Sequence, residues 1–174
     1  MDQIDVSWDV TPVAQTETMS CWAAAAAMLL SHKSAIPTTE LQACQQAGDM
    51  YVAAFQANTG LAGTAVGDFA QALSCVAEAP QNFMPAGYAA LLQAHGPVWI
   101  GTAILYPTIY RHVRILRALF GDGTFDGTTA TLVDPDGGRE YQQTVTELAK
   151  ELEEIAREDL ADGSDLNPQV IRLP

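Results

Sequence analysis

The segment that decides the fold reads Gln15-Thr16-Glu17-Thr18-Met19-Ser20-Cys21-Trp22-Ala23 and continues through an alanine run to Leu30. Alanine has the highest helix propensity and Ser20 is a suitable N-cap, so we expect a helix that begins at or next to Cys21. A helix N-terminus carries a partial positive charge, which lowers the pKa of a thiol placed there and favours the nucleophilic thiolate. The same cysteine can also be a small buried hydrophobic residue, so the rest of the chain must separate the two interpretations.

Helical patterns dominate the chain up to residue 95. Pro12 favours an extended N-terminal segment over residues 1–14. Thr39-x-x-Gln42 resembles a capping box and predicts a second helix. The helices expected after the first cover residues 39–47, 66–77 and 85–95, whereas residues 48–63 are ambiguous.

Strand patterns follow from residue 97 onward. They cover residues 98–105, 112–120, 128–133 and 139–144, and glycine- and aspartate-rich turns separate them. Residues 146–159 return to helix, with Leu148, Leu152 and Ile155 on the inward face and glutamates on the outer face. Because helices come first along the chain and strands follow, we expect one α+β domain over residues 1–174. It has a helical part at about 15–96, a sheet part at about 97–145 and a C-terminal helix at about 146–159.

The composition restricts partners and compartment. The formal net charge of −13 would repel phosphate backbones and anionic lipid, so we expect no nucleic-acid partner and no membrane partner. The N-terminus lacks the layout of a secretory signal, and the longest apolar run, residues 22–30, is too short to span a bilayer. Three irregularly spaced cysteines do not form a disulfide framework or a zinc knuckle, and they fit a reducing compartment. We expect no metal and no organic cofactor.

A glutamine stands six positions before Cys21, and a tryptophan follows it directly. This segment resembles the active-site segment of papain-like cysteine peptidases. The resemblance implies that Cys21 is the nucleophile and that its backbone N–H and the Gln15 side-chain amide donate to the oxyanion. It makes Trp22 a packing residue near the base and a candidate substrate-binding residue. It also implies a papain-like fold, in which an N-terminal helical lobe carries the nucleophile helix and packs on a C-terminal antiparallel sheet lobe.

Papain-like peptidases also use a histidine at the start of a sheet strand and an Asn or Asp one strand further on. His112 opens an expected strand, and a glycine-rich hairpin leads from it to Asp134. By this resemblance His112 is the general base and Asp134 orients its imidazole, with Asp136 as the alternative. His32 and His95 lie at expected helix ends, where we interpret them as C-terminal caps.

The spacing between the cysteine and the histidine differs from that of papain and narrows the resemblance to a subgroup of papain-like peptidases. His112 follows Cys21 by 91 positions, fewer than the roughly 130–150 of papain and the cathepsins. The closer resemblance is to compact bacterial members, namely bacteriocin-leader peptidases and effector proteases that bacteria inject into other cells. It implies a cysteine protease that cleaves a protein substrate through a Cys-His-Asp triad and acts as a bacterial effector or toxin domain. Such a protein is made in the bacterial cytoplasm, delivered by a secretion system and kept silent by an inhibitor or immunity protein.

Three other functions stay open at this point: a papain-fold peptidoglycan amidase, a transglutaminase-like acyltransferase and a non-catalytic binding domain. Cys44 and Cys75 lie in helical, alanine-rich segments and are interpreted as core residues. Arg111, Arg114 and Arg117 surround the proposed base. We interpret these arginines as an exposed strand face, with binding of acidic substrate residues as the alternative.

Overall fold

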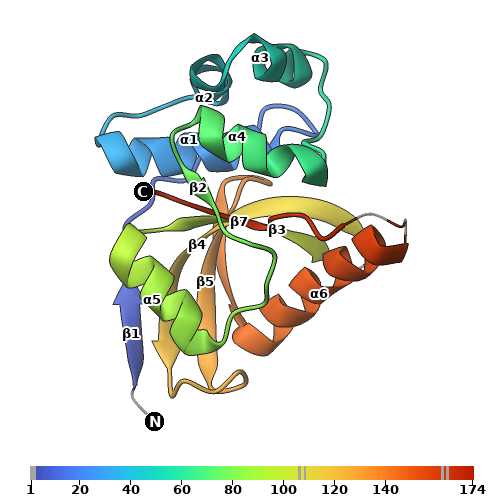
Figure 1. Cartoon of the computed structure of the whole chain (residues 1–174). Helices are drawn as coiled ribbons and strands as arrows, with labels where there is room; N and C mark the ends of the chain where they lie inside the picture. Colours follow the sequence, from blue (N-terminus) through green and yellow to red (C-terminus); the bar gives the residue numbers. More distant parts are fainter. Residues whose placement is uncertain (1–2, 106, 108, 162, 164) are drawn as a thin grey trace.

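The computed structural model describes residues 3–105, 107, 109–161, 163 and 165–174. Four helices gather on one side of an antiparallel sheet and form the helical lobe (Figure 1). These helices are α1 (Cys21–Ser34), α2 (Glu40–Ala47), α3 (Asp49–Gln56) and α4 (Val66–Ala72), with a 3-10 turn η1 (Gly63–Ala65) before α4. The mixed helical and antiparallel architecture confirms the α+β, papain-like fold class.

Among the described residues the sheet has seven strands, and its main path runs β2-β7-β3-β4-β5-β6, with β1 paired to β4. The strands are β1 (Ile4–Ser7), β2 (Val76–Ala77), β3 (Val98–Ile104), β4 (Tyr110–Gly121), β5 (Thr128–Asp134), β6 (Arg139–Thr144) and β7 (Val170–Arg172). All their pairings are antiparallel. Two further helices, α5 (Pro85–His95) and α6 (Val145–Ala161), flank the sheet (Figure 1).

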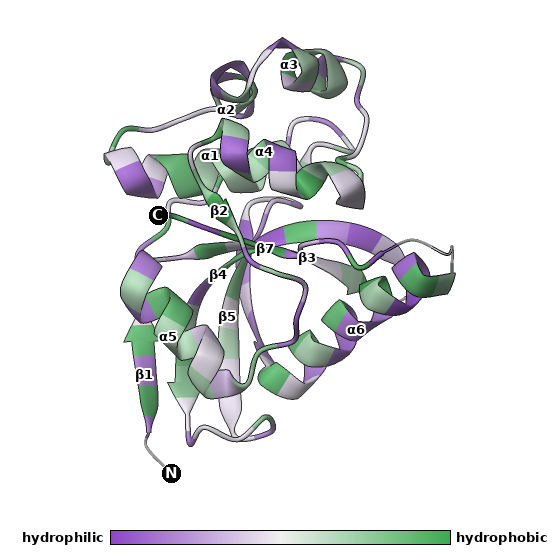
Figure 2. Ribbon diagram, in the orientation of Figure 1, coloured by the Kyte–Doolittle hydropathy of each residue, from purple (hydrophilic) through white to green (hydrophobic). Residues whose placement is uncertain are grey.

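Two apolar cores follow from the alternation of side chains along the strands, because successive residues of a strand point to opposite faces. One face, which includes Trp99 and Ile115, packs against the helical lobe. The other face, which includes Ile100 and Leu116, packs against α5 and α6. In Figure 2, α6 alternates apolar and polar positions along its length. Its expected inward residues, Leu148, Leu152 and Ile155, are buried.

One local expectation was wrong because a short segment pairs with a distant strand, and two other segments are more regular than the sequence indicated. The helix expected at 66–77 ends at Ala72, and residues 76–77 instead form β2, which pairs with β7. The N-terminal segment, expected to be merely extended, contains β1 on the edge of β4. The ambiguous stretch 48–63 contains α3. Strands as short as β1 and β2 cannot be recognised from the local sequence, because their stability comes from the partner strand.

Within the described ranges, no helix combines the length and the apolar composition needed to cross a membrane.

Candidate active site

Helix α1 places Cys21 at the edge of the helical lobe. The residues from Trp22 to Leu30 are all buried, and the five alanines are at most 1% exposed. A helix that is apolar all round is a buried helix, and small side chains allow neighbouring elements to approach its backbone closely. Cys21 is half-buried at the first position of this helix, where the backbone N–H has no intrahelical acceptor. The expected helix start is therefore confirmed.

Ser20 has a different role from the one expected. It occupies the N-cap position, but its side chain makes no capping hydrogen bond to the helix. The Ser20 Oγ instead donates to the Glu40 carboxylate at 2.6 Å. Local sequence could not reveal this contact, because Glu40 belongs to the next helix and lies 20 positions further along the chain.

His112 and Asp134 meet on adjacent strands. His112 lies near the start of β4, and Asp134 is the last residue of β5, the strand that pairs with β4. His112 Nε2 lies 2.6 Å from Asp134 Oδ1, and both residues are buried. Because Asp134 is an acceptor, Nε2 is the donor and Nδ1 is the other ring nitrogen. Cys21 and His112 line the same pocket, and the Cys21 side chain contributes to the raised pKa of the imidazole.

The alternative acid, Asp136, lies outside this contact. Its carboxylate is exposed and pairs with Arg139 at 3.1 Å. Its backbone N–H donates to Asp134 Oδ1 at 2.8 Å, so Asp136 supports Asp134 through the main chain. Of the two aspartates, Asp134 is the one that the structure brings to the imidazole.

Electrostatics at His112 favour the charged imidazolium. Burial alone would lower the His112 pKa, but the hydrogen bond to Asp134, the neighbouring Cys21 side chain and the negative charge of Asp134 outweigh burial and raise this pKa from 6.5 to about 9. At Asp134, burial opposes ionisation, yet the hydrogen bond and charge of His112 hold the pKa below its ordinary value. A protonated imidazole beside a thiol favours the thiolate, which is the form of cysteine that attacks.

Tyr110 covers part of the imidazole. Its ring makes an edge contact with His112, with centroids 5.9 Å apart and planes at 66°. Sequence reasoning missed this residue because a tyrosine two positions before a histidine carries no motif. The Tyr110 side chain is itself exposed and also lines the pocket beside Cys21.

Gln15 lies in the loop that leads to Cys21. Its Nε2 donates to the carbonyls of Glu17 at 2.8 Å and Thr18 at 3.1 Å. Its Oε1 is buried and, among the described residues, has no hydrogen-bond partner. The Gln15 backbone N–H donates to the Pro135 carbonyl at 2.9 Å, which joins this loop to the turn that follows Asp134.

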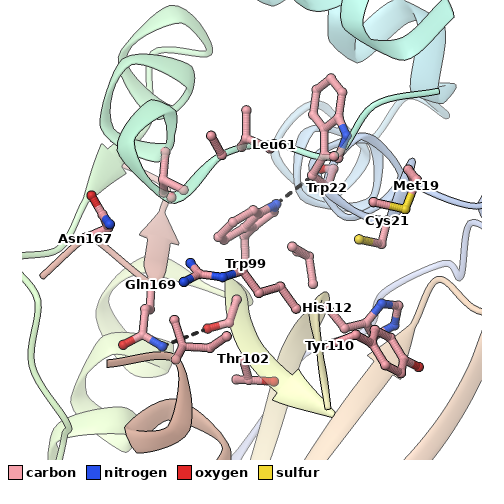
Figure 3. Close-up of a pocket in the computed structure, with 18 of the residues that line it drawn as sticks. Met19, Cys21, Trp22, Leu61, Trp99, Thr102, Tyr110, His112, Asn167 and Gln169 are labelled. Carbon is pink, nitrogen blue, oxygen red and sulfur yellow. Dashed lines mark hydrogen bonds between the residues drawn. The ribbon is translucent and has the colours of Figure 1, made fainter. Parts of the chain in front are cut away.

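Trp22 does not pack near the base. Its ring is buried in the helical lobe, where it makes an edge contact with Phe69, and Nε1 donates to the Thr59 carbonyl at 3.1 Å. Figure 3 shows the ring directed away from His112. The Trp22 carbonyl accepts from Trp99 Nε1 at 3.2 Å, so this residue connects the helical lobe to the sheet. The expected packing role is therefore corrected, although Trp22 does line the pocket beside Cys21.

A pocket of about 420 Å³ opens beside Cys21 and His112 and extends toward Asn167 and Gln169 (Figure 3). Its walls are mostly apolar and include Leu61, Val66, Trp99, Val113 and Ile155. Arg111 also lines it, and its guanidinium pairs with Asp159 at 2.5 Å. The far wall comes from α6 and from the segment before β7, elements that sequence reasoning did not connect with the site.

The arginines do not form one exposed face. Arg114 is fully buried and donates to Thr102, to Tyr141 and to Glu151, the last at 2.5 Å. The exposed-face interpretation was wrong for this residue because β4 is an inner strand with a helix packed over it. Arg111 and Arg117 are partly exposed, and each pairs with a carboxylate.

The other cysteines lie in the protein interior. Cys44 and Cys75 are both buried, and burial raises the Cys44 pKa to about 11. Over the described part of the chain, no group of three or more His, Cys, Asp or Glu side chains could hold a metal ion.

Comparison with known proteins gives one family. A family model described as papain-like cysteine protease AvrRpt2 matches residues 2–153. No curated protein matches the chain. The matched span contains Gln15, Cys21, His112 and Asp134, and it ends before Asn167 and Gln169 at the far end of the pocket. The chain therefore belongs to the family of the papain-like cysteine protease AvrRpt2 and is a cysteine peptidase.

Proposed function

We propose that the protein hydrolyses peptide bonds of a protein substrate through a triad of Cys21, His112 and Asp134. The observation that carries this proposal is the buried 2.6 Å contact between His112 and Asp134, together with the position of His112 and Cys21 on the wall of one pocket. The position of Cys21 at the start of α1 adds the favourable end of the helix dipole.

The mechanism follows from these positions. The Cys21 thiolate attacks the peptide carbonyl and forms a carbon–sulfur bond. His112, charged at neutral pH, then gives its proton to the leaving amine as the carbon–nitrogen bond breaks. In the second half, His112 takes a proton from water, the hydroxide attacks the thioester, and the carbon–sulfur bond breaks to release the acid and the thiolate. Asp134 holds the imidazole orientation and stabilises its charge throughout.

Two donors are proposed for the oxyanion. The Cys21 backbone N–H is a first-turn donor without an intrahelical acceptor. The Gln15 Nε2 is bonded to two loop carbonyls, so one N–H group exchanges its carbonyl for the oxyanion when substrate binds. Catalytic hydrogen bonds of this kind tighten in the complex.

The pocket supports a preference within the substrate. Its apolar walls begin at Cys21 and His112, so it can accept an apolar side chain close to the scissile bond. The Arg111 guanidinium already pairs with the Asp159 carboxylate, so this contact does not support the alternative that Arg111 binds an acidic substrate residue.

The experiment compares wild type with Cys21→Ala after brief expression, with new protein N-termini identified by mass spectrometry. We expect cleavage sites that occur only with wild type and that carry an apolar residue near the cut. Cys75→Ala, which removes a buried thiol outside the pocket, is the matched control and should cleave like wild type. Cleavage by Cys21→Ala, or a folded wild type that cleaves nothing, contradicts the proposal.

The same proteins distinguish the other reactions. Release of peptide fragments from purified peptidoglycan indicates an amidase, and incorporation of an added primary amine into the acyl product indicates a transferase. A wild-type Cys21 that neither reacts with a thiol alkylator nor supports any of these reactions indicates a binding domain.

We further infer a role as a bacterial effector or toxin domain, delivered by a secretion system and restrained by an inhibitor or immunity protein. The family membership supports the effector role. Expression of wild type, but not of Cys21→Ala, is expected to slow growth of a recipient cell that lacks the inhibitor. Equal growth with both proteins, at equal protein levels, contradicts this role.

A further inference from the structure

Glu40, the first residue of α2, is a buried carboxylate that contacts the loop before the nucleophile. Glu40 is only 4% exposed. Its Oε2 accepts hydrogen bonds from the Thr16 backbone N–H at 3.0 Å and from the Thr16 hydroxyl at 2.6 Å. Its Oε1 accepts from the Ser20 hydroxyl at 2.6 Å. The two oxygens of one side chain therefore hold both ends of the segment 16–20.

The position of these two ends relative to the oxyanion donors is the central observation. Thr16 directly follows Gln15, and Ser20 directly precedes Cys21. Each residue that Glu40 contacts is therefore the chain neighbour of one proposed oxyanion donor. A shift of either end moves the Gln15 amide relative to the Cys21 N–H, because only the segment 16–20 separates the two residues along the chain.

The chemistry of the contact also favours a fixed geometry. A buried carboxylate is tolerated when its oxygens are saturated by donors, and short hydrogen bonds to a charged acceptor are stronger than neutral ones. Three donors from one loop reach Glu40, whose place in the first turn of α2 adds the favourable end of that helix dipole. The middle of the loop is held separately by Asn58, which accepts from the Met19 N–H at 2.9 Å.

We propose that Glu40 is a positioning residue for the oxyanion site: its carboxylate sets the distance between the Gln15 amide and the Cys21 N–H by clamping Thr16 and Ser20. This role rests on the proposed function, and it assigns to α2 a part in a reaction whose other groups come from α1 and the sheet. Glu40 acts through the loop and touches no reacting atom.

The test uses Glu40→Ala and Glu40→Gln in the full chain. Alanine removes all three acceptor contacts. Glutamine keeps one oxygen for Thr16, and its amide can donate to the Ser20 hydroxyl, whose proton then turns to the Glu17 carbonyl at 3.1 Å. Glu147→Ala is the matched control, because the Glu147 carboxylate accepts from the backbone N–H and hydroxyl of Thr144 in the same pattern, at 2.7 and 3.0 Å.

Three quantities are measured: kcat and KM for a peptide taken from an identified cleavage site, the rate of Cys21 alkylation by iodoacetamide, and amide hydrogen exchange over residues 15–20. For Glu40→Ala we expect kcat to fall by roughly 10- to 100-fold, since misplaced oxyanion donors cost this much. KM and the alkylation rate should stay within about three-fold of wild type, because alkylation forms no oxyanion. Exchange over residues 15–20 should rise, and glutamine should restore kcat to within about five-fold.

Several results would overturn the positioning role. An unchanged kcat in Glu40→Ala shows that the clamp does not serve catalysis, while cleavage by wild type leaves the proposed function intact. If kcat and the rate of Cys21 alkylation fall by similar factors in Glu40→Ala, Glu40 acts on the reactivity of the thiol or on the stability of the fold. Unchanged hydrogen exchange over residues 15–20 refutes the clamp even if the wild-type protein proves to have another activity.

Discussion

The charge of His112 provides a sharp prediction, because the Asp134 carboxylate that contacts the imidazole is a main cause of its raised pKa. In the structure the His112 pKa is raised from 6.5 to about 9, against the effect of burial. A rise of this size corresponds to about 3 kcal/mol in favour of the imidazolium. Asn in place of Asp134 keeps an oxygen near Nε2 but removes the negative charge. With the charge gone, burial lowers the pKa of the imidazole, so the imidazolium is lost at a lower pH.

The assay is the pH dependence of kcat/KM for peptide cleavage. Wild type should lose activity on the alkaline side near pH 9, as His112 deprotonates. Asp134→Asn should move this alkaline limb down by about one to two pH units, with a lower maximum. Asp136→Asn is the matched control, because that exposed carboxylate pairs with Arg139 and the backbone N–H to Asp134 remains. An alkaline limb that stays in place in Asp134→Asn, or that moves in Asp136→Asn instead, refutes the reasoning.

Three further predictions concern stability and the oxyanion. Because its folded pKa is raised, His112 contributes stability that is fully present below about pH 6.5 and is lost by about pH 9. Urea unfolding across this pH range should show a fall in the free energy of unfolding of wild type and a smaller fall in that of Asp134→Asn. Arg114→Met leaves the Glu151 carboxylate without its buried partner and should lower the free energy of unfolding by about 3–5 kcal/mol, whereas the exposed Arg157→Met should change it by less than about 0.5 kcal/mol. Gln15→Ala should reduce kcat by about 10²- to 10³-fold, as loss of one oxyanion donor does, and an unchanged kcat would exclude Gln15 from that role.

The local parts of the fold were predictable from the sequence. The alanine run specified α1 because alanine loses least on entering a helix, and the start of that helix placed Cys21 at its N-terminus. The capping box at Thr39 and Gln42 is present as expected. The strands and turns around His112 and Asp134 were predictable from the sequence, because a strand signal is an apolar run between glycine-rich turns and involves only residues that are close in the chain.

The tertiary structure decided what depends on distant segments. The register between β4 and β5 brings Asp134, and not Asp136, to the imidazole, and a shift of two residues is invisible to composition. The burial of Arg114 and the formation of β2 depend on α6 and β7, which arrive from the end of the chain. The Glu40 contact likewise exists only because α2 packs beside the loop before Cys21. Sequence alone thus determined the reactive residue types and their local elements, whereas distances between side chains far apart in the chain come only from packing.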